Sequence, residues 1–333
     1  MEQHRIEVLL EAEQPISHLA ESFGNVGILA TRPIRQEDGS IARVPEISGD
    51  AMRHGLREAG AYVFLDACGM LDNPALSEAA LRLLYAGGMV TGKGDAGAVR
   101  LGEYRKMVDL VPLLALLGGC AENRTIPGRM NVDPATLVCE ESLRFLPEWI
   151  RMHPMVAPQT ADTWRASVEE VQRVRMDPSL DPGKRALLES GAVAQIEARL
   201  DRSEKASRDD DAAGAQANKS TMLPRRYERV IQGALFSWSV TVTLFNPLDT
   251  DTFYTALLGF MSNIIVGGKR STGHGKMRVV QAQRTVLRRA RELPRPEDVS
   301  LAVAGNPEIG KLFLGHVEER AAKIREYLAT VNA

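Results

Sequence analysis

A glycine-rich basic run near the end of the chain has the residue types of an anion-binding loop. It reads Gly267-Gly268-Lys269-Arg270-Ser271-Thr272-Gly273-His274-Gly275-Lys276 and contains no acidic residue. Glycine permits positive φ and lets the backbone approach a ligand closely, while exposed N–H groups and the Lys and Arg side chains attract negative charge. The run therefore predicts a phosphate-binding loop. A tight, solvated connection between two elements is the alternative that its composition leaves open.

A second cationic segment lies far away in the sequence, at the start of a predicted helix. Residues 47–57 place Ser48 or Asp50 at the helix N-cap, and Arg53 and Arg57, four residues apart, on one outer face. Backbone N–H groups at the start of a helix favour anions, so this face has the geometry to hold a backbone phosphate. The alternative is a solvated face whose arginines pair with neighbouring acids.

Two histidines lie within these basic segments and have the chemistry to act as acid or base on RNA. His54 belongs to the helix start and His274 to the glycine-rich run. Hydrogen-bonding or stacking contacts without catalysis are the favoured interpretation, because no second titratable partner is evident in the sequence. The six histidines show no pair at metal-ligand spacing, and the sequence predicts neither a metal site nor another cofactor.

The composition is that of an ordinary soluble protein and excludes one that is basic throughout. The chain has 333 residues, of which 44% are apolar and 25% charged, and its formal net charge is −2. Nucleic-acid binding requires a basic stripe rather than a basic average, and Arg225 and Arg226 begin a third cationic cluster before a predicted strand. The N-terminus lacks the pattern of a secretory signal, and the longest apolar stretch, 107–121, is too short for a bilayer. We therefore expect a cytoplasmic protein with no membrane partner.

Alternating apolar and polar residues predict two strands of a half-buried sheet, at 5–13 and 235–245. Helical spacing predicts a helix after the second strand, capped by Asp249 or Asp251, and the glycine-rich run then leads into a strand from Met277. The apolar positions of this helix are Phe253, Leu257, Met261 and Ile264. The late part of the chain therefore has the order strand, helix, glycine loop, strand.

The earlier part of the chain predicts one further strand. Residues 129–139 favour a strand, which Pro134 confines to a sheet edge or divides into two short pieces. The segment between the first strand and a helix at 49–60 is expected to be irregular. In order the elements give β-α, β and β-α-β, which indicates an α+β fold. The expected core is a ferredoxin-like, RRM-like split βαβ sheet with helices on one face.

Two long insertions interrupt this pattern, and a helix ends it. Residues 61–125 are predicted to be helical. Residues 145–224 contain a predicted helix near 184–206 and a polar stretch at 207–220 that we expect to be mobile. The C-terminal helix carries an apolar stripe of Ile309, Leu312, Phe313, Val317, Ile324 and Leu328.

The order of four short motifs resembles that of the RAMP superfamily. Ile47-Ser48-Gly49-Asp50-Ala51-Met52-Arg53-His54-Gly55-Leu56-Arg57 resembles its helix-opening element, and the glycine-rich run is similar to its C-terminal loop. Between them, Leu116-Leu117-Gly118-Gly119 is similar to a turn of the family, and residues 225–236 resemble the stretch that leads out of its thumb. The members with this order are the backbone subunits of class 1 CRISPR effector complexes. General likeness favours the type IV complexes.

The resemblance implies a hand-shaped protein with an RRM-like palm, helical fingers and a thumb. The implied parts are a palm of 1–60, 126–144 and 225–290, fingers of 61–125, a thumb of 145–224, and a C-terminal helical segment of 291–333. Such a protein polymerises along a guide RNA (crRNA) as a helical filament of its own copies, beside other CRISPR effector subunits, and supports pairing with a target nucleic acid.

The resemblance also implies which residues contact RNA. The implied phosphate contacts are Arg53, His54, Arg57, Arg225, Arg226, Gly267, Gly268, Lys269, Arg270, Ser271, His274 and Lys276. Met222 and Leu223, just before the thumb exit, are implied as an apolar wedge between bases.

One departure from the family pattern bears on catalysis. RNA-cutting backbone subunits carry an aspartate in the loop after the first strand, whereas the matching region here reads Ile28-Leu29-Ala30-Thr31-Arg32-Pro33. We therefore expect RNA binding without cleavage and no catalytic residue. One alternative is a RAMP-type endoribonuclease that matures the guide RNA through His54 or His274. A structural oligomer without nucleic acid is a third possibility, which the negative net charge leaves open.

Overall fold

The structure, a computed structural model, describes most of the chain as two compact units. The described residues are 1–23, 26–72, 75–89, 97–121, 123–174, 191–198, 224–287, 296–298 and 308–331. The larger unit consists of Met1–Leu19, Leu29–Glu169 and Arg229–Ala333, and the smaller of Ala20–Ile28 and Glu170–Glu228.

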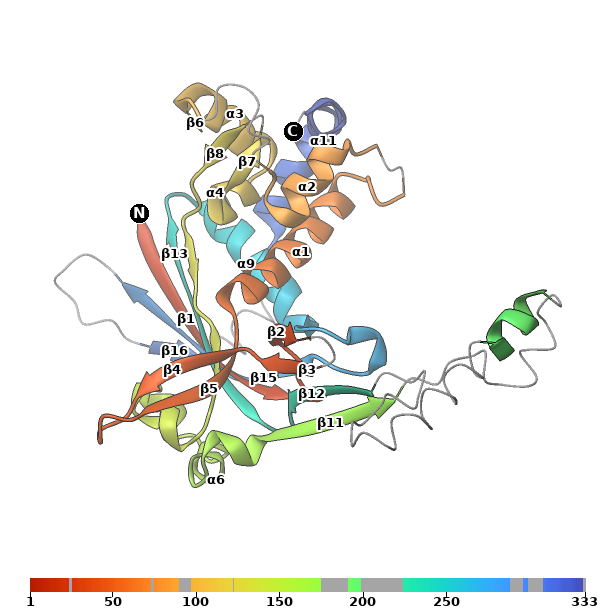
Figure 1. The fold of residues 1–333 in the computed structure, drawn as a ribbon. Coiled ribbons are helices and arrows are strands. Elements are labelled where there is room, and N and C mark those ends of the chain that lie inside the picture. The colour runs from red at the N-terminus through yellow and green to blue at the C-terminus, as the bar shows by residue number, and fades with distance from the viewer. Residues whose placement is uncertain are drawn as a thin grey trace, which may run out of the picture. The chain divides into compact units, whose positions relative to one another are not determined.

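An antiparallel sheet forms the centre of the larger unit (Figure 1). Its strands follow the order β14-β15-β1-β13-β10-β5-β4, with β16 paired to β15 and β9 paired to β13. β1 is central, because β13 and β15 both pair with it along most of its length. The bounds are β1 (Glu2–Ala12), β4 (Thr31–Arg35), β5 (Ile41–Ile47), β9 (Met130–Val132), β10 (Ala135–Leu137), β13 (Leu235–Leu244), β14 (Ile264–Ile265), β15 (Lys276–Leu287) and β16 (Pro296–Asp298).

The two-residue period of β1 and β13 gives the sheet an apolar and a polar face. Ile6 lies opposite Val240 and Val8 opposite Trp238, and all four side chains are buried in the main core. The residues between them in β13 are serines and threonines, which point to the other face. The strands predicted at 5–13 and 235–245 are thereby confirmed.

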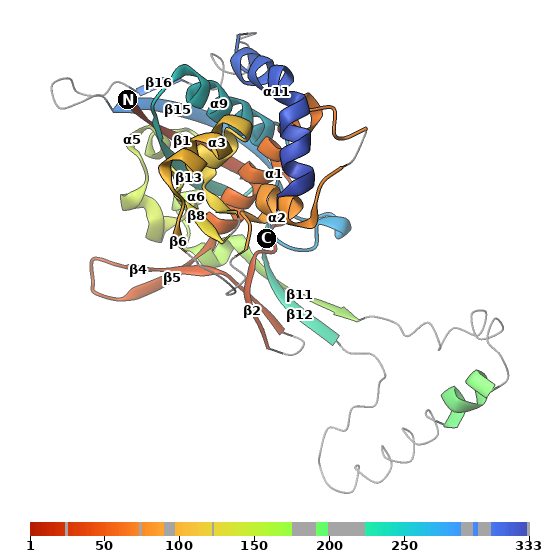
Figure 2. The same cartoon turned by 90° about the horizontal axis from the view of Figure 1, so that it is seen from above.

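The apolar face is covered by α1 (Gly49–Ala67) and α9 (Pro247–Ser262), which lie side by side in both views (Figures 1 and 2). A Cβ atom at Gly55 would lie 2.4 Å from the Phe260 ring, so glycine is what allows the two helices to approach so closely. A second core forms where α11 (Lys311–Thr330), α2 (Glu78–Ala86), α3 (Leu101–Leu110) and α4 (Leu113–Leu117) pack around α1. A small sheet, β6 (Gly97–Ala98), β8 (Arg124–Ile126) and β7 (Gly119–Ala121), completes this region.

Part of the polar face is covered by four short helices that follow β10. They are η1 (Glu140–Phe145), α5 (Glu148–Arg151), α6 (Val156–Thr160) and η2 (Trp164–Ser167). Ile150 and Val156 from these helices bury Leu9 of β1 and Leu235 of β13 in a third core. The remainder of this face stays open and is hollowed by a pocket.

The smaller unit is built around a separate sheet with the order β11-β12-β3-β2. Its strands are β2 (Leu19–Phe23), β3 (Val26–Leu29), β11 (Val168–Val174) and β12 (Pro224–Val230). Residues 191–198 are helical, inside the helix predicted near 184–206. The rest of that predicted helix and the polar stretch 207–220 lie outside the described residues.

The sequence pattern also places Pro134 correctly. Pro134 falls between β9 and β10, so residues 129–139 form two short strands rather than one. The expectation of an irregular segment before α1 is wrong, because β2, β3, β4 and β5 form there. All four strands are short, and β4 and β5 contain arginines and a proline each, Pro33 and Pro45, so these segments lack a clean alternation.

Three details of the predicted helices differ from the structure. The side chain of Asn246 caps α9 by accepting a hydrogen bond from the Asp249 amide, and neither Asp249 nor Asp251 is the cap. Ile264 belongs to β14, because α9 ends at Ser262. Leu312 is exposed on α11, whereas Phe313 and the other predicted positions within the helix are buried.

The observed fold is α+β, with an RRM-like antiparallel sheet and large helical insertions. Across the described ranges, no helix combines the length and apolar character needed to cross a membrane.

Candidate nucleic-acid interface

The first basic segment begins where α1 starts against the sheet. Ser48 caps the helix, because its hydroxyl oxygen accepts a hydrogen bond from the Ala51 amide at 3.3 Å. A Cβ atom at Gly49 would lie 2.5 Å from the carbonyl oxygen of Val132, so the close approach of α1 to β9 requires glycine. Cap and glycine together fix the direction in which Arg53, His54 and Arg57 leave the helix.

Arg57 points into the protein, and the implied phosphate contact at this position is not supported. Its side chain is 7% exposed. Nη1 donates to the carbonyl of Leu83 at 3.3 Å, and Nη2 donates to those of Leu117 and Gly118, each at 3.0 Å. Burial, aided by the neighbouring charge of Arg53, lowers the pKa of Arg57 to about 10. Arg57 therefore joins α1 to α2 and to the turn at 117–119.

Arg53 and His54 remain nearer the surface. Arg53 is half-buried and donates from Nη2 to the carbonyl of Leu117, the same acceptor that Arg57 uses. His54 is exposed. The Leu-Leu-Gly-Gly motif thus supplies the acceptor carbonyls for both arginines, a role that its sequence does not reveal.

The second basic segment is a closed loop between β14 and β15. The Val266 amide donates to the Gly275 carbonyl at 2.9 Å, and the Gly275 amide donates to Pro15 at 3.0 Å. A Cβ atom at Gly275 would lie 2.2 Å from the Val266 carbonyl oxygen. The loop is therefore closed by backbone contacts that a larger residue at position 275 would break.

Lys269 has the left-handed conformation, with φ of 60°, which glycine usually occupies. An L-residue other than glycine pays a conformational cost there of roughly 1 kcal/mol. Three glycines of the same loop also have positive φ, Gly267 at 76°, Gly273 at 77° and Gly275 at 96°. The strained lysine at this position suggests a use for its charge.

His274 is buried, and the implied contact with RNA at this position is not supported. Its side chain is 2% exposed. Nδ1 lies 3.1 Å from the carbonyl oxygen of Thr272, and Nε2 lies 3.2 Å from Nη1 of Arg229. A proton on Nδ1 satisfies both contacts, since that nitrogen then donates to Thr272 and Nε2 accepts from Arg229. His274 holds the loop in shape instead of presenting an acid or base.

The exposed part of the loop lies beside α1. Nη1 of Arg270 is 3.8 Å from Oε2 of Glu58 on α1, and both side chains are about half exposed. The loop 15–18 contacts both segments. The Gly268 amide donates a hydrogen bond to the Ser17 carbonyl at 2.7 Å, and the Ser48 amide donates to Nε2 of His18 at 3.1 Å. The two basic segments, more than two hundred residues apart in the chain, therefore lie together in one unit.

Other predicted loop contacts are placed as follows. Ser271 and Gly268 are exposed, and Gly267 is half-buried against Ser17. Nζ of Lys276 pairs with Glu13 at 2.9 Å across neighbouring strand ends, with half of the lysine side chain exposed. Exposed ion pairs of this kind contribute little and can exchange for a phosphate.

A groove between α1 and α9 adjoins Arg270 and was not predicted from the sequence. Its volume is about 530 Å³, and Gly55, Glu58, Tyr62 and Phe260 line it together with Arg270. Tyr62 is 59% exposed. The signal in the sequence is the spacing of Glu58 and Tyr62, four residues apart on the outer side of a helix whose opposite side is apolar.

The remaining predicted residues belong to the smaller unit. Arg225 and Arg226 lie on β12 and are exposed, and Nε of Arg226 is 3.9 Å from Glu170 on β11. β12 runs parallel to β3 at Arg226 and Tyr227. Met222 and Leu223, the implied wedge, lie outside the described residues.

Comparison with solved structures finds the same fold in a chain of a structure titled "Type IV-B CRISPR Complex". The two chains are 18% identical, the TM-score is 0.50, and the match covers 91% of this chain and 99% of that chain. No protein-family model and no curated protein matches this sequence. At this identity the likeness establishes the fold, and the resemblance derived from the order of the motifs is confirmed at that level.

Proposed function

We propose that this chain is a non-catalytic backbone subunit of a CRISPR ribonucleoprotein, which binds guide RNA through the glycine-rich loop and the exposed side of α1. One observation carries the proposal: the loop exposes Gly268, Arg270 and Ser271 beside α1, and the fold is shared with a chain of a type IV-B CRISPR complex. Backbone amides with adjacent cations favour a phosphate chain over a neutral ligand.

The contacts divide into those that bind and those that support. Arg53, His54, Lys269, Arg270 and Ser271 form the binding set, with Lys276 at its margin. Arg57 and His274 hold the same segments from inside, because their donors and acceptors are already used by the protein. Arg225, Arg226, Met222 and Leu223 keep the thumb role that the resemblance implies. Copies of the chain assemble along crRNA in the cytoplasm with other CRISPR subunits and support target pairing.

Binding without cleavage is part of this proposal. The two ring nitrogens of His274 are engaged with Thr272 and Arg229, and it cannot exchange a proton with RNA without breaking the loop. His54 is the exposed histidine of the two. Single-turnover incubation with repeat RNA should leave the RNA intact, and specific cutting that disappears in His54→Ala would establish the endoribonuclease alternative.

The central test measures RNA that copurifies with charge-reversed variants. Lys269→Glu combined with Arg270→Glu should remove most of this RNA, because both cations lie on the exposed loop. The charge-matched control is Lys311→Glu with Lys323→Glu on α11, which should retain RNA. Equal RNA content in the two double variants would contradict the proposed interface. The salt dependence of binding should also flatten, by roughly 0.7 in log–log slope for each phosphate that the variant no longer neutralises.

Lys269→Gly separates binding from folding at the same position. Glycine relieves the left-handed backbone conformation, so the variant should be as stable as the natural protein or slightly more so. The same change removes one cation from the loop and should weaken RNA binding. A variant that is stabilised and binds RNA unchanged would show that Lys269 does not contact the phosphate chain.

A further inference from the structure

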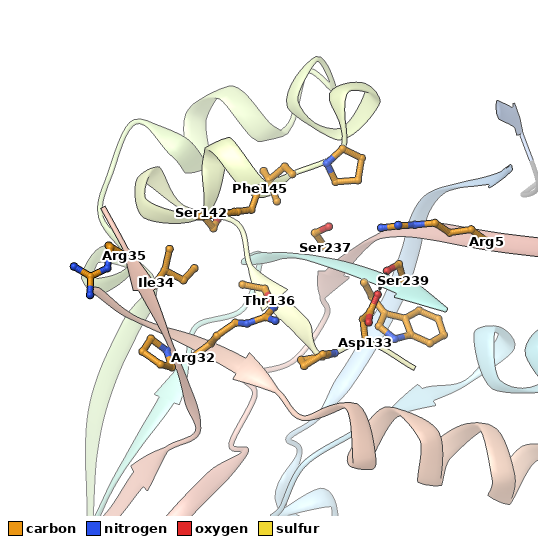
Figure 3. A pocket seen from close by; sticks show the side chains of 15 residues that line it. Arg5, Arg32, Ile34, Arg35, Asp133, Thr136, Ser142, Phe145, Ser237 and Ser239 are labelled. Atoms are coloured by element: carbon orange, nitrogen blue, oxygen red, sulfur yellow. Dashed lines mark hydrogen bonds between the residues drawn. The ribbon is translucent and has the colours of Figure 1, made fainter. Parts of the chain in front are cut away.

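The open part of the polar sheet face carries a pocket that the guide-RNA proposal does not use. Its volume is about 400 Å³, and it lies between β1, β13, β10, the β4–β5 hairpin and η1 (Figure 3). α1 and α9 cover the opposite face, so the pocket is separate from the glycine-rich loop. Three arginines and one aspartate are the charged residues that line it, namely Arg5, Arg32, Arg35 and Asp133.

Two of the arginines point into the pocket from opposite sides. In Figure 3 the side chains of Arg5 and Arg32 extend toward the middle of the floor, whereas that of Arg35 turns outward. Arg35 donates instead to the carbonyl of Gly39 in its own hairpin, at 3.4 Å. The pocket thus has guanidinium groups that face its floor from two sides, and guanidinium groups are suited to binding a phosphate.

Arg5 is held in its direction by neighbours outside the pocket. Its Nε lies 3.1 Å from Oε1 of Glu7, and Oε2 of Glu7 accepts a hydrogen bond from Nε1 of Trp149 at 2.9 Å. Glu7 therefore binds Nε of the Arg5 guanidinium group, and this contact does not use the two terminal Nη groups. Such a supporting contact reduces the entropy that Arg5 loses when it binds a ligand.

Besides Glu7, two further carboxylates lie near the pocket, Asp133 and Glu46. Asp133 accepts hydrogen bonds from the Ser239 hydroxyl and from Nδ2 of Asn131. Glu46 lies on β5 opposite Thr136 of the floor, and burial raises its pKa although the charge of Arg32 acts in the other direction. Arg5 and Arg32 are the cations that face the floor of the pocket.

The floor and rim of the pocket also carry hydroxyl groups and an aromatic ring, which the binding of a phosphate ion alone would not require. Thr136 and Ser237, paired across β10 and β13, place hydroxyl groups on the floor. Phe145 stands at the rim and is 61% exposed, an unusual state for an aromatic side chain that lines a cavity. A ring of this kind offers a surface on which a base can stack, with the guanidinium of Arg144 4.6 Å from its centre.

We infer that this pocket binds a nucleotide, with its phosphate between Arg5 and Arg32, its sugar over Thr136 and Ser237, and its base against Phe145. The nucleotide is either free or one unit of a single strand; the recognising chemistry is the same. The inference does not depend on the guide-RNA proposal, because none of these residues belongs to the glycine-rich loop or to α1.

Calorimetric titration of the full chain, freed of copurified nucleic acid, tests the inference with AMP, inorganic phosphate and adenosine as probes. AMP should bind more tightly than phosphate or adenosine. Arg5→Gln and Arg32→Gln should each lower the affinity for AMP by about tenfold, the loss typical of one charge-assisted contact. Arg35→Gln is the matched control from the same lining and should have little effect. Absence of AMP binding, or equal affinities for AMP and phosphate, would overturn the inference.

Two further variants separate this pocket from the other site and from misfolding. Arg270→Gln should leave AMP affinity unchanged; a loss equal to that of Arg5→Gln would mean that AMP binds at the glycine-rich loop, and would overturn the assignment. Phe145→Ala alters an exposed side chain and should fold normally, as thermal melting will show. The variant should bind AMP more weakly and bind phosphate with unchanged affinity. An unchanged AMP affinity would show that Phe145 does not contact the base.

Competition between AMP and a five-uridine RNA identifies the source of the nucleotide. Displacement of AMP by the RNA means that the pocket takes one unit of a strand. AMP binding that the RNA does not disturb means that the pocket takes a free nucleotide. Either result supports the assigned chemistry, and a failure of AMP to bind while guide RNA still copurifies would leave only the guide-RNA proposal standing.

Discussion

Arg53 and Arg57 look equivalent in the sequence and have different roles in the structure. Both lie on α1, four residues apart, and both donate to the carbonyl of Leu117. Only Arg57 is buried and uses two further carbonyls, Leu83 and Gly118. Its charge is tolerated inside because every contact is a charge-assisted hydrogen bond.

Arg57→Ala should destabilise the protein by roughly 3 kcal/mol, because it leaves buried carbonyls without a donor and opens a cavity. Arg57→Lys should recover only part of this loss, since one ammonium group cannot reproduce the planar fork. Urea unfolding measures both changes. Arg53→Ala is the control and should cost less, as its side chain is nearer the surface. Normal stability of Arg57→Ala, combined with the absence of copurified RNA, would instead make Arg57 a ligand contact.

Residue types predicted the exposed glycine-rich loop better than the surroundings of each side chain in it. The glycines and cations of 267–276 indicate an exposed loop, and the structure has one. The sequence could not show that His274 is enclosed, because its partner Arg229 lies 45 residues away in the chain, on β12, and only the fold brings the two side chains together. Burial of a polar residue in a loop depends on such long-range contacts and leaves no local pattern.

At the scale of elements, one aspartate of α9 sets the start of another helix. Asp251 accepts hydrogen bonds from the amides of Gly310, at 2.7 Å, and Phe313, at 2.8 Å, and is itself buried. The α11 N-terminus is thus capped by a distant side chain rather than by its own flanking residue.

Asp251→Ala should cost roughly 2 kcal/mol, because it removes a cap and leaves buried amides unpaired. Hydrogen exchange should accelerate first in the opening turn of α11. Asp249→Ala is not an equivalent change, because Asp249 pairs with Arg129, and it should affect the amide of Phe245 instead. Unchanged protection at the start of α11 in Asp251→Ala would contradict this account of the cap.

The contact between loop 15–18 and the start of α1 should make the stability of the protein depend on pH. Nε2 of His18 accepts a hydrogen bond from the Ser48 amide, and burial lowers the pKa of His18 below its usual 6.5. A histidine whose folded pKa is lowered contributes stability that is present above the unfolded value and is lost as pH falls through the folded value. The loss therefore belongs to the range below about pH 6.5.

His18→Gln should flatten this part of the stability profile, since glutamine can accept from Ser48 and does not titrate in that range. Urea unfolding of both proteins across the same pH series gives the comparison, in which the other histidines cancel. A difference between the two proteins that stays constant from neutral to acidic pH would exclude the role of His18.

Elements with long, regular alternation were predictable, and elements defined by pairing alone were not. β1 and β13 keep the two-residue period except at Leu9 and Leu235, and Pro134 marks the break between β9 and β10. β2 to β5 are short and stabilised by their neighbours, so their sequences resemble loops. The helices within 140–167 were likewise not predicted, because they are stabilised by packing on Leu9 and Leu235 of the sheet and this contact depends on the fold.

At the scale of the whole molecule, the charge distribution bears on assembly. The net charge is −2, whereas the glycine-rich loop exposes Arg270 and Lys276 in one region and has no acidic residue. Copies of a protein with this distribution have no general attraction for one another, and a polyanion that bridges the cationic regions supplies what is missing. Assembly should therefore require RNA and follow its length.

Light scattering of the purified chain mixed with RNAs of stepwise doubled length should show a copy number that rises in proportion, with a constant number of nucleotides per copy. The chain without RNA should remain small. Lys269→Glu with Arg270→Glu should abolish the growth, whereas the α11 control pair should preserve it. A single copy on every RNA would contradict polymerisation, and growth without RNA would mean that contacts between protein copies, rather than the cationic region, drive assembly.

A nucleotide bound in the pocket on the polar sheet face would add contacts between RNA and each copy without changing the number of nucleotides per copy. Arg5→Gln should therefore weaken RNA binding and leave the copy number per unit length of RNA unchanged.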